Sequence, residues 1–224
     1  MIFLEHIKDT TQDAAPVFAL ALGDASHTAI SGLPPTFSSG PDAFLEEAVC
    51  GKPLRVSAGS FFQSSPHSAE ALVRAVVSAL GDTTDVSRWA DLYCGVGLFA
   101  ATVLRDREVI AVERSGSSTA DARINLADRA GEVVESDVES WAPVNCDAVV
   151  ADPARSGLGR RGVEVVTATD APVLVLVSCD AASLGRDTQL LGAAGYRHAG
   201  SVVLDLFPQT PHVEVVTRFE RDAR

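Results

Sequence analysis

From about residue 89 onward, short apolar runs alternate with segments in which apolar positions recur at helical spacing. Strands buried on both faces of a parallel sheet read as continuous apolar runs, and helices that cover a sheet repeat every three or four residues. The predicted strands are residues 90–92, 109–112, 133–134, 148–151 and 173–177. The predicted helices are residues 98–104, 118–129 and 181–193. This alternation predicts a parallel sheet covered by helices on both faces.

The last two apolar runs break the alternation. Residues 202–206 and 213–219 are predicted strands, and the connection 207–211 is too short for a crossover helix. The two strands are therefore expected to pair antiparallel. A parallel sheet closed by a C-terminal antiparallel hairpin resembles the class I methyltransferase fold, a Rossmann-like α/β architecture.

The first 58 residues have an irregular pattern. Residues 17–22 could form a strand, and residues 31–35 are a turn-rich break. A helix is predicted over residues 68–80, ended by Gly81. A chain of 224 residues is long enough for one α/β domain plus an annex. We expect a small N-terminal annex at 1–58 and the α/β domain at 59–224.

Composition excludes several classes of protein. No apolar stretch approaches membrane-spanning length, and Glu5 interrupts the apolar start too early for a signal peptide. The four cysteines lack the paired spacing of a zinc or iron–sulfur site, which predicts no metal and a reducing, cytoplasmic environment. Thirty acidic and 18 basic residues give a net charge of −12, which is unfavourable for non-specific binding to nucleic acid.

Four arginines form a local basic group in this acidic chain. Arg155, Arg160 and Arg161 are expected on one loop, and Arg186 follows Cys179 at a short distance. Such a group can hold phosphates at the edge of an acidic protein. The alternative is that these arginines are ordinary solvated surface residues, and the net charge alone favours that alternative.

Reactive side chains follow or open three of the predicted strands. Cys179 follows the run 173–177, Asp152 follows the run 148–151, and Glu214 opens the reversed last strand. Ligands bind beyond the carboxyl ends of the strands in open α/β sheets, and a reversed strand begins at that same edge. We therefore expect the three side chains to face one crevice. Cys179 also precedes a helix N-terminus, which is expected to lower the pKa of its thiol; alternatively it is an inert buried thiol.

A glycine-rich loop supplies a cofactor site. The segment from Asp91 to Gly97 reads Asp-Leu-Tyr-Cys-Gly-Val-Gly and also fits a dinucleotide pattern, so an NAD-dependent oxidoreductase is an alternative. Asp91 would repel a pyrophosphate at this helix N-terminus, whereas it suits the ammonium group of S-adenosylmethionine. Glu113 is then placed to bind the ribose and Asp137 to reach the adenine.

Five motifs, in order along the chain, carry a specific resemblance. They are Phe61-Phe62-Gln63-Ser64-Ser65-Pro66, the segment 91–99, Asp152-Pro153-Ala154-Arg155-Ser156-Gly157, Ser178-Cys179-Asp180, and Phe207-Pro208-Gln209-Thr210-Pro211-His212-Val213-Glu214. From about residue 55 to its end, the chain resembles the catalytic domain of the RNA uracil-5-methyltransferases. The resemblance implies S-adenosyl-L-methionine as cofactor, transfer or ribosomal RNA as substrate, Cys179 as nucleophile and Glu214 as base. It also implies cofactor contacts from Gln63, Tyr93, Gly95, Gly97, Leu98, Glu113, Asp137 and Asp152.

The two reactive groups suit that chemistry. Carbon 5 of uracil is a poor nucleophile, and addition of a thiolate to carbon 6 makes it an enolate carbon. A base must then remove the carbon-5 proton before the thiol leaves, which is the role expected of Glu214. Asp152 could accept a hydrogen bond from the ring imide. The target base must leave its stack, and Phe61, Phe62 or Phe207 could stack on it.

The chain also departs from the family. Four positions differ from what is usual in the family: Ser65, Ala154, Asp180 and Leu98. Many members have a polar side chain at the position of Leu98, so only a backbone contact is expected there. His212 is expected to orient Glu214 or to bind a carbonyl. Cys94 and Cys146 are expected in the core.

The family's N-terminal RNA-binding barrel is not visible before residue 55. A separate RNA-binding module or partner is therefore expected. A second alternative is a truncated, weakly active or inactive cofactor-binding domain. An adenine N-methyltransferase would use Asp152-Pro153, but it expects an aromatic residue at the position of Arg155 and has no need of Cys179.

Overall fold

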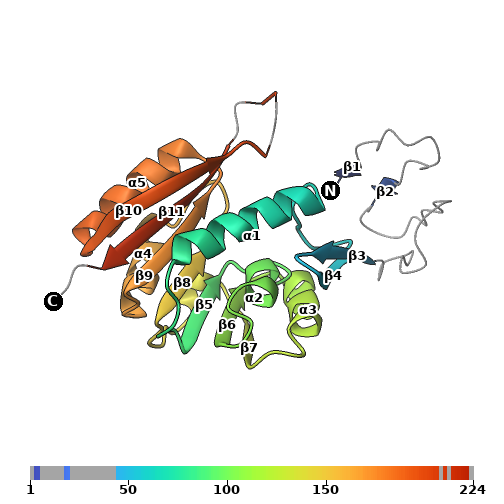
Figure 1. The fold of residues 1–224 in the computed structure, drawn as a ribbon, viewed down its shortest axis with the longest axis horizontal. Helices are drawn as coiled ribbons and strands as arrows, with labels where there is room; N and C mark the ends of the chain where they lie inside the picture. The colour runs from blue at the N-terminus through green and yellow to red at the C-terminus, as the bar shows by residue number, and fades with distance from the viewer. Residues whose placement is uncertain (1–2, 6–17, 21–43, 207–208, 211–212, 222–224) are drawn as a thin grey trace.

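A seven-stranded sheet forms the centre of the molecule. The computed structural model describes residues 3–5, 18–20, 44–206, 209–210 and 213–221 (Figure 1). The strand order across the sheet is β10-β11-β9-β8-β5-β6-β7. The strands are β5 (Arg88–Leu92), β6 (Glu108–Glu113), β7 (Gly131–Glu135), β8 (Ala148–Ala151), β9 (Val173–Ser178), β10 (Tyr196–Leu204) and β11 (Glu214–Arg221). Strand β11 lies between β9 and β10 and is antiparallel to both, while β5 to β9 are parallel. The predicted Rossmann-like sheet with a C-terminal antiparallel hairpin is confirmed.

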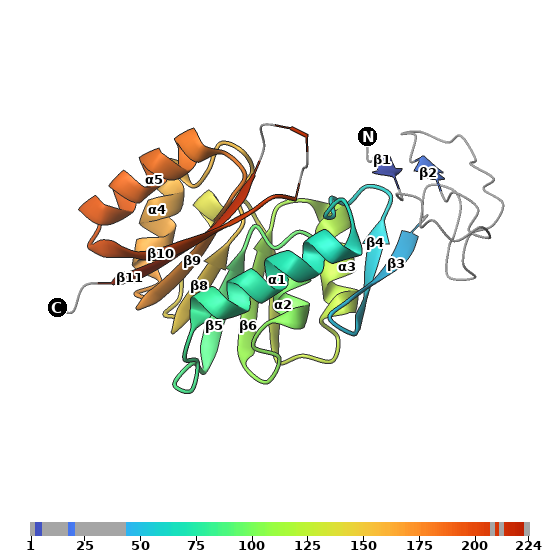
Figure 2. The same ribbon diagram turned by 45° about the horizontal axis from the view of Figure 1, so that its top comes forward.

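Helices cover both faces of this sheet (Figures 1 and 2). One face carries α1 (Pro66–Leu80), α2 (Leu98–Thr102) and α3 (Gly116–Asn125), and the other carries η1 (Val138–Ser140), α4 (Gly159–Ala168) and α5 (Ala181–Ala193). Successive residues of a strand point to opposite faces. Accordingly, Val175 and Val177 of β9 belong to the first apolar cluster, and Leu174 and Leu176 belong to the second.

The N-terminal segment contains regular structure that the irregular sequence pattern did not predict. Strands β3 (Phe44–Val49) and β4 (Lys52–Ser57) form a hairpin closed by Cys50 and Gly51, whose φ angles of 50° and 75° suit a two-residue hairpin loop. Buried apolar side chains of the hairpin belong to the same cluster as those of α1. Strands β1 (Phe3–Glu5) and β2 (Phe18–Leu20) pair antiparallel, and β2 falls within the predicted strand 17–22. The break at 31–35 lies outside the described residues, and the domain boundary at residue 58 stays a prediction.

Two further elements differ from the prediction. Helix α4 was expected to be loop, so Arg160 and Arg161 lie on a helix and not on the loop of Arg155. The helix has no side-chain cap at Leu158, which explains the missing sequence signal. Strand β10 begins at Tyr196, six residues before the predicted start, and its side chains are mostly exposed. In the part of the chain that the structure describes, no helix combines the length and apolar content needed to cross a membrane.

Candidate active site

The carboxyl edge of the sheet brings Asp152, Cys179 and Glu214 to one place. Asp152 directly follows β8, Cys179 directly follows β9, and Glu214 is the first residue of β11. Val215 pairs with Ser178 in the antiparallel ladder between β11 and β9. Continuing that register by one residue sets Glu214 opposite Cys179, and side chains directly opposite each other lie on the same face of a sheet.

The two carboxyl groups at this edge hold protons more strongly than usual. Glu214 is only 6% exposed, and burial raises its pKa from 4.5 to about 7, against the opposing charge of Arg155. Among the described residues, the Oε2 atom of Glu214 has no hydrogen-bond partner. Burial, and then the charges of Glu214 and Asp91, raise the pKa of Asp152 well above its usual range. A carboxyl with a pKa near 7 is suited to accept a proton at neutral pH.

The expected lowering of the Cys179 pKa is wrong for this structure. The half-buried thiol has a raised pKa because of burial and then the charges of Glu214 and Asp152, while Arg155 acts in the opposite direction. The N-terminus of α5 is already capped, since Asp180 accepts a hydrogen bond of 2.7 Å from the Ser183 amide. The thiol is therefore mostly protonated at neutral pH.

The glycine loop adjoins the same edge, between β5 and α2. Tyr93, Gly95 and Gly97 all have positive φ angles, of 61°, 54° and 84°. Glu113, at the end of β6, accepts hydrogen bonds from the amides of Gly95 (3.1 Å) and Ser115 (2.8 Å). A Cβ atom added to Gly95 would meet nothing within 4 Å, so there is open space beside the loop.

Asp91 lies beneath this loop and is fully buried. Its Oδ2 atom accepts a hydrogen bond of 2.8 Å from the amide of Ala100 in the first turn of α2. Its Oδ1 atom has no partner among the described residues, and burial raises its pKa to about 7. The Asp91 carboxyl group thus stabilises the first turn of α2, a structural role that the sequence did not suggest. Its contact with the ammonium group of the cofactor stays a prediction.

Comparison with known proteins places these features in a family. No family model matches the chain. An uncharacterized RNA methyltransferase of Streptomyces avermitilis is 37% identical over 197 residues, which cover 81% of this chain and 44% of that protein. The 23S rRNA (uracil(1939)-C(5))-methyltransferase RlmD of Pseudomonas putida is 36% identical over 173 residues, covering 72% of this chain and 38% of the relative. The crystal structure of Pyrococcus abyssi tRNA (uracil-54, C5)-methyltransferase with S-adenosyl-L-homocysteine matches at 30% identity and a TM-score of 0.70, covering 79% of this chain and 44% of that one.

The chain belongs to the RNA uracil-5-methyltransferase family. This membership confirms the resemblance carried by the five motifs, and the structural match confirms the class I methyltransferase fold. The chain spans less than half the length of these relatives.

The other family positions for the cofactor lie in different surroundings. The hydroxyl of Tyr93 donates a hydrogen bond of 2.7 Å to Glu139. Asp137 is exposed, 3.9 Å from the guanidinium of Arg114. Leu98 is only 6% exposed and belongs to the apolar core on the side of α1. Direct cofactor contacts from these residues stay predictions. Because the Leu98 side chain is buried in the core, only its backbone could contact the cofactor.

The residues of the first motif divide between core and surface. Phe62 is buried in the apolar core and Gln63 is buried beside it in the chain, whereas Phe61 is 69% exposed. Of the candidates for stacking on a base, Phe61 is therefore accessible and Phe62 is not. Phe207 and His212 lie outside the described residues. Cys94 and Cys146 are both buried, as expected.

Sequence reasoning missed a polar contact that supports the glycine loop. The side-chain amide of Asn125 in α3 donates hydrogen bonds to the carbonyl oxygens of Val96 (2.9 Å) and Arg55 (3.0 Å). It also accepts one of 2.7 Å from the Arg55 amide. Asn125 thereby joins β4 to the loop. An asparagine inside the predicted helix 118–129 was the available signal, but one sequence does not show what such a residue contacts.

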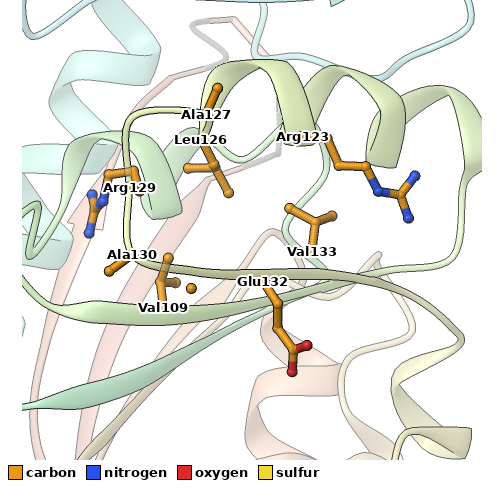
Figure 3. Close-up of a pocket in the computed structure, with 9 residues that line it drawn as sticks. Val109, Arg123, Leu126, Ala127, Arg129, Ala130, Glu132 and Val133 are labelled. Carbon is orange, nitrogen blue, oxygen red and sulfur yellow. The ribbon is translucent and has the colours of Figure 1, made fainter.

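A pocket of about 270 Å³ lies at the opposite end of the sheet, where β6 and β7 meet the end of α3 (Figure 3). Val109, Leu126 and Val133 contribute apolar lining. Arg129 also lines it, but its guanidinium donates to the carbonyls of Ala100 and Leu104. Because the pocket lies at the starts of β6 and β7, it is separate from the opposite edge of the sheet, where Cys179 follows β9. No cluster of three or more His, Cys, Asp or Glu side chains that could hold a metal occurs among the described residues.

Proposed function

We propose that this chain transfers a methyl group from S-adenosylmethionine to carbon 5 of a uridine in transfer or ribosomal RNA. The observation that carries the proposal is the position of Glu214 across from Cys179 at the edge that also holds the glycine loop. The relatives named for uracil methylation act on 23S rRNA and on tRNA, which supports these two classes of substrate.

The residues at the glycine loop fit the proposed cofactor. The open space beside Gly95 and the carboxylate of Glu113 suit an adenosine whose ribose hydroxyls need an acceptor. Asp137 is proposed for the adenine, and Gln63, Tyr93, Gly97, the Leu98 backbone and Asp152 for the remaining contacts. When bound, S-adenosylmethionine supplies an electrophilic methyl group to carbon 5 of the ring.

Cys179 and Glu214 perform the remaining steps. The Cys179 thiol gives its proton to water and its sulfur bonds to carbon 6, so the electrons of the 5,6 double bond move into an enolate. Carbon 5 of the enolate would then take the methyl group, with S-adenosylhomocysteine as the leaving group. Glu214 then takes the proton from carbon 5, the sulfur–carbon bond breaks, and the double bond returns. A pKa of about 7 fits this role, because it makes Glu214 a stronger proton acceptor than an ordinary carboxylate while part of the group is still ionised at neutral pH.

A covalent trap tests the proposal. RNA transcripts that contain 5-fluorouridine are incubated with the protein and S-adenosylmethionine, and the adduct is followed as a band shift in denaturing gels. Fluorine cannot leave as a proton, so the wild-type protein and the control Cys50→Ser, which changes an exposed cysteine, are expected to accumulate adduct. Cys179→Ala should form none, and Glu214→Gln should stall on ordinary RNA after methylation. An adduct formed equally well by Cys179→Ala would refute the role of Cys179.

The alternative is a domain that binds the cofactor without turnover. The net charge of −12, which is unfavourable for binding RNA, favours this alternative. A rise in melting temperature with S-adenosylhomocysteine, together with no adduct on any RNA, would support it over the enzymatic proposal.

A further inference from the structure

The loop between β8 and α4 carries Asp152 and Arg155 to the active-site edge. Residues 152–158 belong to no helix or strand, and the loop turns through a 2.8 Å hydrogen bond from the Gly157 amide to the Ala154 carbonyl. Its position must therefore come from contacts with neighbouring elements. Arg155 is exposed, and its charge lowers the pKa of both Cys179 and Glu214.

A buried carboxylate on α5 supplies those contacts. Asp187 is fully buried, and it accepts hydrogen bonds from the amides of Leu158 (2.7 Å) and Gly159 (3.0 Å). These amides begin α4, which has no side-chain cap of its own. A carboxylate at a helix N-terminus is stabilised by the free amides and by the helix dipole. Asp187 therefore caps α4 from the neighbouring helix.

The same contact fixes the middle of the loop. Arg186 pairs with Asp187 at 2.8 Å and donates to the carbonyl of Ser156. Gly157 lies directly on this pair, since an added Cβ atom would be 2.2 Å from Asp187 Oδ2 and 2.8 Å from an Arg186 nitrogen. The glycine also has a φ of 69°. The backbone of residues 156–159 is thus held closely against α5, the helix that starts just after Cys179.

We propose that Asp187 is a positioning residue: by holding residues 156–159 against α5, it keeps the Arg155 cation beside Cys179 and Glu214. The catalytic meaning of this inference rests on the proposed function. The placement itself rests on the contacts of Asp187, Arg186 and Gly157 with the loop.

The charged groups around Cys179 allow a clean test. The groups that shift the Cys179 pKa are Glu214 and Asp152, which raise it, and Arg155, which lowers it. Asp187 is not among them. An effect of an Asp187 variant on the thiol would therefore not come directly from the charge of Asp187, and comparison with Arg155→Ala tests whether it comes through the loop.

The experiment measures the pH dependence of Cys179 alkylation by iodoacetamide, read by mass spectrometry of the peptide that contains Cys179. Arg155→Ala is expected to slow alkylation at pH 8 by roughly two- to fivefold, because loss of the cation raises the Cys179 pKa and lowers the fraction of thiolate. Asp187→Asn should give a similar decrease. The double variant should be no slower than either single variant, because both changes remove the same interaction.

Two further variants separate positioning from general loss of structure. Asp121→Asn removes another fully buried carboxylate that accepts main-chain and arginine hydrogen bonds, but on α3, away from the loop, and should leave Cys179 alkylation unchanged. Arg186→Gln changes an exposed side chain, keeps the carboxylate, and should give a smaller decrease if Asp187→Asn does not fold.

Additive effects of Arg155→Ala and Asp187→Asn would overturn the inference. Alkylation unchanged in both Asp187→Asn and Arg186→Gln would also overturn it. The assay needs no RNA and no turnover, so its outcome is independent of the adduct experiment. A protein that shows the predicted alkylation pattern but forms no adduct keeps the positioning role of Asp187 and loses the proposed function.

Discussion

Replacing Glu214 by glutamine should stabilise the protein in a strongly pH-dependent way. Burial raises the Glu214 pKa from 4.5 to about 7, so the folded protein binds a proton there that the unfolded chain has released. Stability is then lost as the pH rises from about 4.5 through 7, which is opposite to the usual case of a carboxylate with a depressed pKa. Between pH 5 and pH 8 this linkage removes about 2.5 kcal/mol from the wild-type protein.

Glutamine has nearly the same shape and carries no charge at either pH. The gain in unfolding free energy of Glu214→Gln over wild type should therefore be larger at pH 8 than at pH 5 by about 2.5 kcal/mol. The accompanying decrease in the Asp152 pKa adds to the difference with the same sign, since the charge of Glu214 helps to raise that pKa.

Urea unfolding at the two pH values measures this difference. Glu164→Gln, which changes an exposed carboxylate on α4, is the matched control and should shift stability equally at both pH values. An equal gain for Glu214→Gln at pH 5 and pH 8 would mean that the carboxyl group is not buried in the way described, and the reasoning on its role as base would fail with it.

One other substitution tests the supporting contacts, and a second measurement on Glu214→Gln tests the thiol. Asp121→Asn removes a buried carboxylate that binds Arg55 and the backbone of β4. Urea unfolding should show that the free energy of unfolding falls by about 2–4 kcal/mol, and an unchanged unfolding midpoint would contradict this prediction. Glu214→Gln also removes a charge that raises the Cys179 pKa, so Cys179 should be alkylated by iodoacetamide roughly three- to tenfold faster at pH 8 than in wild type. A rate equal to or below that of wild type would show that the two side chains are not close.

The parallel strands could be predicted because the sequence encodes them as uninterrupted apolar runs. Strand β8 has the predicted bounds, and β9 extends the predicted run by one residue. These strands are mostly buried on both faces, and every residue of the two predicted runs is apolar, so the signal is dense; the polar Ser178 follows at the end of β9. The edge strand β10 is mostly exposed, and only its last, apolar part was recognised.

The hairpin of β3 and β4 and the helix α4 lacked such a signal for different reasons. The hairpin turns at Cys50-Gly51, which is not one of the common turn pairs, and β4 contains Pro53. Helix α4 begins after Leu158 with no cap in its own sequence, because its cap is Asp187 on α5. A cap supplied from a distant part of the chain leaves no local pattern to read.

The positions of the reactive groups followed from topology, but their protonation did not. The order of the strands already set Cys179 and Glu214 at one edge, whereas the pKa of each depends on burial and on charges from several elements. In this structure burial, and then the charges of Glu214 and Asp152, raise the Cys179 pKa, while Arg155 acts in the opposite direction. Proton transfer from the thiol to Glu214, whose pKa is about 7, is therefore unfavourable in the absence of substrate. Any change that moves Arg155 away raises the Cys179 pKa further. The contacts of Asp187 with the loop of Arg155 therefore bear on the protonation of Cys179 as much as the residues around the thiol do.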